Sequence, residues 1–353
     1  MDGQGPWLTV NLAAVQRNTR RFSNLVGVPV MPMVKANAYG LGAVAVARAL
    51  EPVEPWGYGV ATLAEARTLR DGGIDRPIMA FWPLQPEWID EYLALKVRPA
   101  IGDLRGLDAW ISRSAGPFHL EIDTGMGRAG FRWHDVDALA AVSARLAATR
   151  WFEGIFTHFG SADCSEIATE EQWSRFTAIV AGLGPRPPLV HAANSGAGQW
   201  QGRYAGNLAR PGIFLYGGRA GPIAGEAVAE LTAAVVAIRP LRAGDPVSYG
   251  GSYLAAADGE VATLAIGYAD GVHRTLGNAG VVAIGNQILA IAGRVTMDMT
   301  MVVAPRGAIR VGQMATIFGG SVGLDAQADR AGTISYELLT SVGSRVIRRY
   351  REE

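Results

Sequence analysis

The sequence predicts an α/β protein with an N-terminal (β/α)8 barrel of the TIM type and a mostly β C-terminal domain. Up to about Gly218, eight short apolar runs alternate with longer segments of helical periodicity, as in a barrel of repeated strand–helix units. After roughly Gly225 the pattern changes to strand-like pieces, glycine turns and β-branched residues. The chain of 353 residues is long enough for two domains. We expect the barrel to span 1–225 and the β domain 226–353.

Each predicted barrel strand is a short apolar run. In chain order the runs are "VPVMPMV" (28–34), "WGYGVA" (56–61), "PIMAFW" (77–82), "KVRPAI" (96–101), "FHLEID" (118–123), "WFEGIFTH" (151–158), "PLVHAAN" (188–194) and "NLARPGIFLYG" (207–217). Segments between them, such as 62–73 and 168–184, have apolar residues at helical spacing and stop at glycine. A doubly wound open sheet is the alternative architecture. In the second part, "EVATLAIGYADG", "GVVAIGNQILAIAGRV" and "QMATIFGG" carry the strand pattern.

The composition is typical of a soluble enzyme. The 32 basic and 32 acidic residues give a net charge of zero, so no basic surface indicates a nucleic acid or an anionic membrane as partner. The single cysteine, Cys164, excludes an internal disulfide and a multi-cysteine metal cluster; we interpret it as a loop residue and expect no metal site. The first residues do not resemble a signal peptide, and no later run is long enough to span a bilayer. We therefore expect a cytoplasmic enzyme.

Unusual polar residues stand where the predicted barrel strands end. Lys35 closes the first run, 123–128 follow the fifth, His158 closes the sixth, Asn194 and Ser195 close the seventh, and Arg210 lies within the eighth. In a barrel of this type the catalytic groups come from the C-terminal ends of the strands. Charged residues scattered at random over the surface would not coincide with the ends of the strands in this way. The clustering therefore favours a functional site.

Two of these segments suit particular chemistry. Partial burial would lower the pKa of the Lys35 amine and free it as a Schiff-base nucleophile, although Lys35 taken alone is more simply explained as a rim lysine pointing into water. "HAANSGAG" and "RPGIFLYG" offer Ser195, Gly212 and Ile213 as hydroxyl and backbone N–H donors. Loops after the last two barrel strands often bind phosphate, whereas each glycine alone is explained equally well by a tight turn.

Taken together, the motifs resemble one family along nearly the whole chain. They are "VKANAYG" (34–40), "DTGMGRAGF" (123–131), "THF" (157–159), "HAANS" (191–195), "RPGIFLYG" (210–217), "VSYG" (247–250), "IGYADG" (266–271), "GRVTMDM" (293–299) and "SYELL" (335–339). In this order they resemble the alanine racemases, which are fold-type III enzymes dependent on pyridoxal 5′-phosphate (PLP). The resemblance implies a homodimer that interconverts L-alanine and D-alanine and supplies D-alanine for peptidoglycan.

The resemblance implies a two-base mechanism. Lys35 would form the Schiff base with PLP and exchange the proton on one face of Cα, while Tyr249 would act on the other face. Because a free tyrosine is a poor base at neutral pH, it needs help, which the family supplies through residues matching His158 and Arg210. Arg210 would also donate to the pyridine nitrogen of PLP. Since arginine stays protonated, the cofactor is a weaker electron sink than with a carboxylate there, which suits racemisation without side reactions.

The remaining roles implied by the resemblance concern binding. Arg128 would hold the substrate carboxylate through its planar fork, with the backbone of Met297 as a further donor. The residues matching the phosphate-contacting positions are Tyr39, Ser195, Gly212, Ile213 and Tyr336. The residues matching the corridor through which substrate reaches the site are Tyr268, Arg274, Arg294 and Tyr336. The residues that would act on the barrel site of the partner subunit, making the dimer obligatory, are Tyr249, Tyr268, Met297 and Asp298.

Three positions depart from the commonest family pattern. Leu41 stands where many relatives have histidine, and Thr296 where many have cysteine. Glu121, seven residues before Arg128, stands where many relatives carry a lysine that carbon dioxide converts to an anionic carbamate. Strand alternation puts Glu121 on the same face as His119, inside the barrel. We hypothesise that Glu121 replaces the carbamate and orients Arg128, the alternative being a glutamate paired elsewhere or with solvent.

Three other functions were weighed. Amino-acid decarboxylases of the same fold type carry a cysteine motif in the C-terminal domain, which this chain lacks. Non-catalytic PLP-binding homeostasis proteins consist of the barrel alone. An aldolase or isomerase barrel would use Lys35 without a cofactor. None of them fits as many residues, although the substrate range, alanine alone or also serine, stays open.

Overall fold

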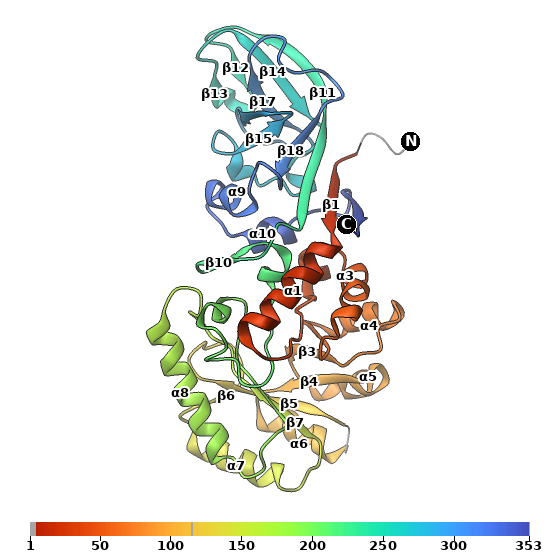
Figure 1. The fold of residues 1–353 in the computed structure, drawn as a ribbon, viewed down its shortest axis with the longest axis vertical. Coiled ribbons are helices and arrows are strands. Elements are labelled where there is room, and N and C mark those ends of the chain that lie inside the picture. Colours follow the sequence, from red (N-terminus) through yellow and green to blue (C-terminus); the bar gives the residue numbers. More distant parts are fainter. Residues whose placement is uncertain (1–4, 114–115, 353) are drawn as a thin grey trace.

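The protein consists of a barrel and a β-rich part stacked along the long axis of the molecule (Figure 1). The structure is a computed structural model and describes residues 5–113 and 116–352. Within this part of the chain, no helix is both long and apolar enough to cross a membrane.

Six parallel strands form the wall of the barrel in the order β2-β3-β4-β5-β7-β8. They are β2 (Tyr58–Val60), β3 (Ile78–Pro83), β4 (Val97–Ile101), β5 (Phe118–Asp123), β7 (Phe152–Phe156) and β8 (Leu189–His191), with β6 (Phe131–Arg132) paired to β5. Each of the six coincides with one of the predicted runs, although β3 extends one residue past its run, to Pro83.

The first and eighth predicted runs close the barrel without forming regular strands. Val30 bridges to Ala209 and Met33 bridges to Gly59, both in parallel. The backbone N–H of Arg210 donates to the carbonyl oxygen of Ala193 at 2.8 Å, which joins the eighth run to the end of the seventh. The (β/α)8 barrel is thereby confirmed, with the open sheet excluded by this closure.

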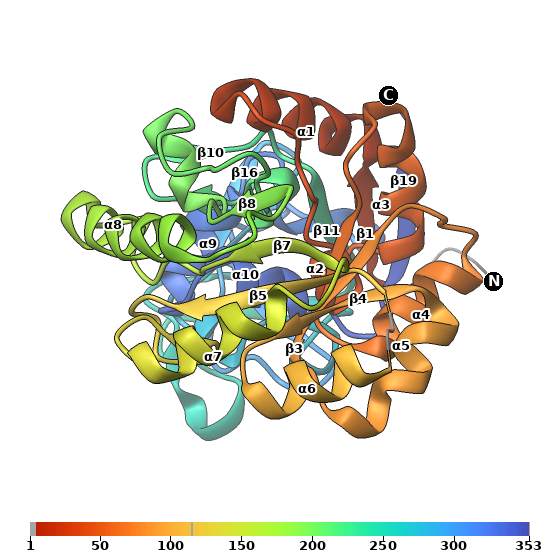
Figure 2. The same ribbon diagram turned by 90° about the horizontal axis from the view of Figure 1, so that it is seen from below.

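Helices surround the barrel strands, as the view from below shows (Figure 2). The helix between β2 and β3 illustrates why. In α4, Thr62 caps the first turn, Glu65 completes the capping box, and the apolar residues face inward before the helix ends at Gly72. The α-helices of this part are α1 (Leu12–Val26), α3 (Ala43–Leu50), α4 (Leu63–Asp71), α5 (Ile89–Leu95), α6 (Leu104–Ser112), α7 (Val136–Leu146) and α8 (Glu166–Gly182). Its 3₁₀ helices are η1 (Glu51–Val53), η2 (Pro86–Trp88), η3 (Gly196–Trp200) and η4 (Ile213–Tyr216).

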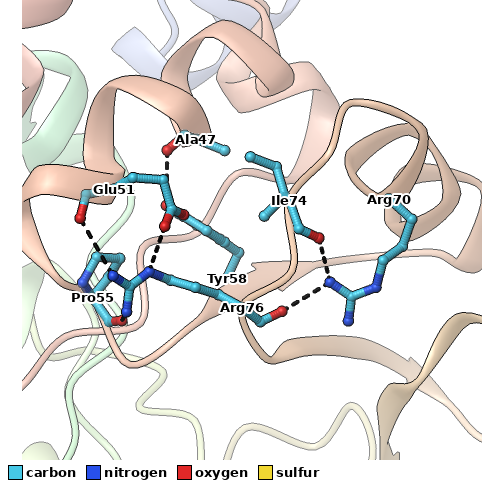
Figure 3. A network of polar contacts seen from close by, with 7 residues as sticks. All are labelled: Ala47, Glu51, Pro55, Tyr58, Arg70, Ile74 and Arg76. Atoms are coloured by element: carbon cyan, nitrogen blue, oxygen red, sulfur yellow. Dashed lines mark hydrogen bonds and ion pairs between the residues drawn. The ribbon is translucent and has the colours of Figure 1, made fainter.

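A polar network anchors β2 to the helix layer (Figure 3). The hydroxyl oxygen of Tyr58 lies 2.8 Å from both the carbonyl oxygen of Ala47 and the carboxylate of Glu51, which share its single proton. Arg76 donates to the other carboxylate oxygen of Glu51 and to the carbonyl of Pro55, also at 2.8 Å. The buried hydroxyl of Tyr58 thus has hydrogen-bond partners, which is what burial of such a group requires.

The second part is mostly β, as predicted. Its large sheet has the order β16-β15-β18-β11-β1-β19, and β14 pairs with β11 and β17. The strands are β9 (Arg219–Ala220), β10 (Ile223–Ala224), β11 (Ala229–Leu241), β12 (Pro246–Val247), β13 (Tyr253–Leu254), β14 (Gly259–Leu264), β15 (Val281–Ile284), β16 (Gln287–Ala290), β17 (Thr300–Ala304), β18 (Met314–Phe318) and β19 (Ile347–Arg351). Its helices are η5 (Tyr249–Gly251), η6 (Tyr268–Asp270), η7 (Arg274–Leu276), α9 (Leu324–Ala331) and α10 (Ser335–Thr340).

One strand of that sheet comes from the beginning of the chain. β1 (Trp7–Asn11) pairs antiparallel with β11 and parallel with β19. The boundary that the sequence suggested, 1–225 against 226–353, assigned these residues to the barrel. Their alternating pattern, with Leu8 and Val10 fully buried, is that of a strand with one face in a core, and the structure places this strand between β11 and β19 of the second sheet. The chain therefore links the two parts twice.

Candidate active site

A cavity of about 550 Å³ opens at the C-terminal ends of the barrel strands, where α10 of the second part covers the barrel. Nine of the sequence-predicted residues line it: Lys35, Tyr39, Arg128, His158, Ser195, Arg210, Gly212, Ile213 and Tyr336. Asn194, which closes the seventh predicted run, lines it as well. Residues beside them that the sequence reasoning did not single out are Met33, Ala36, Phe81, Thr333, Ile334, Glu337 and Thr340.

Lys35 begins a left-handed turn. The segment α2 (Lys35–Tyr39) contains four successive residues other than glycine with positive φ, between 51° and 55°, from Ala36 to Tyr39. Such backbone costs roughly 1–2 kcal/mol per residue for L-amino acids. A run of this kind persists only where surrounding contacts enforce it, and strained backbone of this kind tends to occur at functional sites.

Glu65 holds this turn in place. Its Oε1 accepts a hydrogen bond from the backbone N–H of Ala36 at 2.6 Å, and its Oε2 accepts one from Ala61 at 2.7 Å. The side chain of Asn37 accepts from the backbone N–H of Ala43 at 2.8 Å and ties the far end of the turn to α3. Sequence reasoning missed Glu65. Its capping-box spacing to Thr62 was visible in the sequence, but the contact with Ala36 joins residues far apart in the chain.

The Lys35 amine is tuned toward its neutral form. Burial lowers its pKa, the positive charge of Arg128 lowers it further, and the carboxylate of Glu65 works in the opposite direction. A larger fraction of the amine is thus unprotonated and nucleophilic than for a lysine in water.

One end of the cavity forms a cradle of hydroxyl and backbone N–H groups. The Ser195 hydroxyl oxygen accepts from the N–H of Gly212 at 2.8 Å and of Phe214 at 3.3 Å. A Cβ at position 212 would lie 2.1 Å from the Tyr39 hydroxyl oxygen, so only glycine allows this approach. The ring of Tyr336 lies 5.9 Å from that of Tyr39. Such a set of donors, with no acidic side chain among them, suits a phosphate group.

Arg210 is buried at the floor of the cavity. Its Nη1 donates to Nδ1 of His191 at 2.7 Å and to the His191 carbonyl at 2.8 Å, and its Nη2 donates to the carbonyls of Thr157 and Ala192 at 2.8 and 3.3 Å. Burial lowers the pKa of Arg210 to about 9, which leaves it charged at neutral pH. Among the described residues these bonds leave the Nε–H donor for a ligand. Sequence reasoning missed His191, which stood within the quoted motif "HAANS".

His158 lies beside Arg210 and is neutral. Burial and the charges of Arg210, Arg128 and Lys35 lower its pKa to about 3. Within 5–113 and 116–352, no hydrogen bond joins His158 to Arg210. The positive charge of Arg210 acts on the neighbouring imidazole without a direct bond in one chain.

Arg128 is carried on an ordered loop. Asp123 accepts hydrogen bonds from the backbone N–H groups of Gly125 and Gly127, each at 3.0 Å, and Arg175 donates to the carbonyl of Thr124 at 3.0 Å. Asp123 is thus a loop-shaping residue. The guanidinium at the tip of this loop reaches the cavity wall.

Glu121 lies inside the barrel, on the face shared with His119, as strand alternation predicts. Burial raises the pKa of Glu121 to about 7, and the charges of Arg128 and Arg210 offset part of that rise. In the described part of the chain no hydrogen bond joins its carboxyl group to Arg128. The carboxyl group therefore acts on both arginines through its charge.

The other predicted residues lie outside the cavity, on the surface of the second part. Tyr249, Met297 and Tyr268 are exposed by 69%, 53% and 44% respectively, and Arg274 and Arg294 are also exposed. Hydrogen bonds to the backbone connect the segments that carry several of these residues. Ser248 Oγ donates to the carbonyl of Arg294 at 2.6 Å, and the N–H of Tyr268 donates to Thr296 at 2.9 Å. The segments β12 and β13, which flank Tyr249, lie at the end of the molecule away from the barrel (Figure 1).

Sequence models of two alanine racemase domains match this chain, the N-terminal domain over residues 10–220 and the C-terminal domain over residues 228–350. The chain belongs to the alanine racemase family. Curated alanine racemases include one from Limosilactobacillus fermentum, 38% identical over 97% of each chain, and one from Carboxydothermus hydrogenoformans, 35% identical over 98% of this chain and 99% of the relative.

Solved alanine racemase structures share the whole fold. That from Streptomyces lavendulae covers 100% of this chain and 98% of its own, with a TM-score of 0.92 and 28% identity. That from Bartonella henselae, described with covalently bound pyridoxal phosphate, covers 98% of this chain and 99% of its own, with a TM-score of 0.90 and 27% identity.

Two of the residues that depart from the common racemase pattern have local roles here. Leu41 is fully buried in the core. The Thr296 hydroxyl donates to the carbonyl of Met299 at 2.9 Å and accepts from its N–H at 3.1 Å, so it closes its own turn.

The contacts of Glu65 generate a stability prediction. Glu65→Ala removes the acceptor of three backbone donors, those of Ala36, Ala61 and Thr62, and should lower the free energy of unfolding by about 2 kcal/mol, because hydrogen bonds to a charged group contribute about that much. Urea unfolding followed by circular dichroism measures it. Glu91→Ala is the matched control, since it removes only an exposed pair with Arg67 and should change the free energy by less than about 1 kcal/mol. Equal effects of the two substitutions would show that the turn does not depend on Glu65.

Proposed function

We propose that the chain is a PLP-dependent alanine racemase, an isomerase that interconverts L-alanine and D-alanine. The observation that carries the proposal is the composition of the cavity. A lysine with a lowered pKa, a phosphate cradle and a buried arginine converge in one cavity of a size that holds a cofactor and a small substrate.

The residues present fit PLP. Ser195, Tyr39 and Tyr336 would hold its phosphate together with the backbone of Gly212 and Ile213, and the close approach of Tyr39 to Gly212 is the cradle that a side chain at 212 would fill. Lys35 would hold its carbonyl carbon, and Arg210 would donate its remaining N–H to the pyridine nitrogen. When bound, PLP withdraws electron density from the substrate and so makes the Cα–H bond acidic.

The chain's own residues would bind the substrate and move its proton. Arg128, at the cavity wall, would hold the alanine carboxylate through its planar fork, with the backbone of Met297 of the partner subunit as a second donor. Lys35, freed from the cofactor, would exchange the Cα proton on the D face. Its lowered pKa supports a base that works near neutral pH.

Tyr249 of the partner subunit would exchange the proton on the L face. Its exposure on a surface remote from its own cavity supports a role in trans, together with Tyr268, Met297 and Asp298. Neutral His158 would accept a hydrogen bond from the incoming phenol, and the charge of Arg210 nearby would favour its ionised form. Tyr268, Arg274 and Arg294 would line the substrate corridor of the assembled dimer.

We further propose that Glu121 orients Arg128 in place of a carbamylated lysine, and that the enzyme supplies D-alanine for peptidoglycan in the cytoplasm. Glu121 is buried beside both arginines, which supports an electrostatic role. Serine is a second possible substrate, because one hydroxyl changes the selectivity of a small pocket by only about 1–3 kcal/mol.

The first test is a chiral assay of the purified protein with added PLP. L-alanine should be converted until the two enantiomers are present in equal amounts, and a parallel reaction with L-serine measures the substrate range. A protein that binds PLP and produces neither D-amino acid would contradict the proposed activity and leave the family assignment intact.

The second test asks whether the active sites are shared between subunits. Lys35→Ala and Tyr249→Phe should each be inactive alone. When the two variants are unfolded together and refolded as a mixture, random pairing makes half of the dimers heterodimers, and each heterodimer has one complete site and one defective site. About a quarter of all sites are then complete, so the mixture should regain up to about a quarter of the wild-type activity. The control is each variant remixed with itself. If Tyr249 acted within its own chain, no mixture would recover activity.

The third test concerns Glu121. Glu121→Gln should raise KM for alanine by about tenfold, as expected for loss of a charged partner of Arg128. Because burial raises the pKa of Glu121 to about 7, the wild-type KM should rise as the pH falls through 7, and the variant should lack this dependence.

A linked stability measurement checks the same charge. A carboxyl group whose pKa is raised on folding binds its proton more tightly in the native state, so the wild-type free energy of unfolding should fall as the pH rises from about 4.5 to about 7. Glu121→Gln should remove that slope. An unchanged KM together with an unchanged slope would contradict both the role and the raised pKa.

A further inference from the structure

A continuous line of hydrogen bonds crosses the barrel interior from Arg210 to the opposite mouth. Nη1 of Arg210 lies 2.7 Å from Nδ1 of His191, and Nε2 of His191 lies 2.7 Å from Nδ1 of His119. Nε2 of His119 lies 3.1 Å from Oε2 of Glu153. Arg98 closes the line, donating from Nε to the same oxygen at 2.9 Å.

In each hydrogen bond of this line, only one of the two partners can be the donor. A guanidinium donates and cannot accept, so Nδ1 of His191 must be the acceptor and its proton must be on Nε2. That proton is then donated to Nδ1 of His119, whose own proton must be on Nε2, facing the carboxylate of Glu153. Both rings are therefore neutral and in the same tautomer. Burial lowers the pKa of each, which agrees with this arrangement.

The two ends of the line lie at opposite ends of the barrel. His191 is the last residue of β8, at the end that carries the cavity, whereas Glu153 and Arg98 stand near the starts of β7 and β4. Both histidines are fully buried, and the side chains of Glu153 and Arg98 are 23% and 20% exposed. The line thus connects the buried arginine of the site with the rim of the far mouth.

The barrel is shaped to accommodate the two imidazole rings. His191 stacks on Phe156 at 5.1 Å between ring centroids, and Trp56 packs edge-on against His119 at 5.7 Å. A Cβ at position 154 would lie 2.4 Å from Nδ1 of His119, so glycine is needed there. Phe156 belongs to a buried apolar cluster with Met31, Met79, Ala100 and Leu208, and polar groups buried among such side chains are costly unless every hydrogen bond is made.

We propose that His191, His119 and Glu153 form a relay that positions Arg210 and sets the strength of its guanidinium as a donor in the active site. Glu153 supplies the negative end, and the two neutral imidazoles transmit its polarisation by cooperative hydrogen bonding. A polarised His191 is a stronger acceptor, so it holds Nη1 and fixes the direction of the free Nε–H. The three are positioning residues, since none lines the cavity. The role in catalysis rests on the proposed function.

Histidine ¹⁵N NMR on the full-length protein tests the relay independently of activity. Signals are assigned by comparison with His191→Gln and His119→Gln spectra. Both rings should be neutral Nε2–H tautomers from about pH 6 to about pH 8, a range in which an ordinary histidine titrates. An Nδ1–H tautomer, or protonation of either ring in that range, would overturn the relay whether or not the protein is a racemase.

Substitutions at the far mouth test the effect on the site in the PLP-loaded enzyme. Glu153→Gln keeps the shape and removes the charge; it should shift the absorbance maximum of the bound cofactor and lower kcat at least fivefold, with KM for alanine changed less than twofold. Glu153→Asp keeps the charge and should recover part of both effects. Glu51→Gln is the matched control, because it neutralises the carboxylate of the Arg76 pair at the same mouth without reaching Arg210. If Glu153→Gln and Glu51→Gln behave alike in absorbance and kcat, the line is only structural and the proposal is wrong.

Discussion

The burial of the Arg210 guanidinium is the constraint around which the barrel interior is organised. A charge of this size is costly to remove from water, and the protein compensates it with hydrogen bonds to His191, Thr157 and Ala192. The ring of Phe156 lies 5.1 Å from the guanidinium, which adds a cation–π contact. The charge of Glu121 nearby balances part of it, and the proposed relay would add the charge of Glu153 through two imidazoles. Residues on three barrel strands thus serve to accommodate the single side chain of Arg210.

The left-handed turn at Lys35 is the second costly feature, and both parts of the chain support it. Glu65 binds the turn from the barrel side, and α10 of the second part packs on it so closely that a Cβ at Gly40 would lie 2.4 Å from the carbonyl oxygen of Leu339. The strain places the Lys35 amine and the Tyr39 hydroxyl in one cavity. Because β1 is built into the second sheet, the chain connects the two parts twice.

The second part exposes several large side chains outside the cavity. Tyr249 and Met297 are large side chains exposed to solvent, and short polar contacts around Ser248 and Thr296 order the backbone that carries them. Ordering an exposed surface costs conformational entropy, which association with a second chain would offset. This cost is the physical argument behind the proposed sharing of the site between two subunits.

The sequence by itself determined the alternation of strands and helices, the barrel, the β-rich second part and nine residues of the cavity, because each depends on local periodicity or on motifs a few residues long. The inward direction of Glu121 also followed from alternation along one strand. Only the tertiary structure revealed that β1 belongs to the second sheet, that Glu65 holds the turn after Lys35, and that His191 and His119 lead from Arg210 to Glu153. These features are contacts between residues distant in the chain, and local pattern carries no information about which distant partners the closure of a barrel brings within hydrogen-bonding distance.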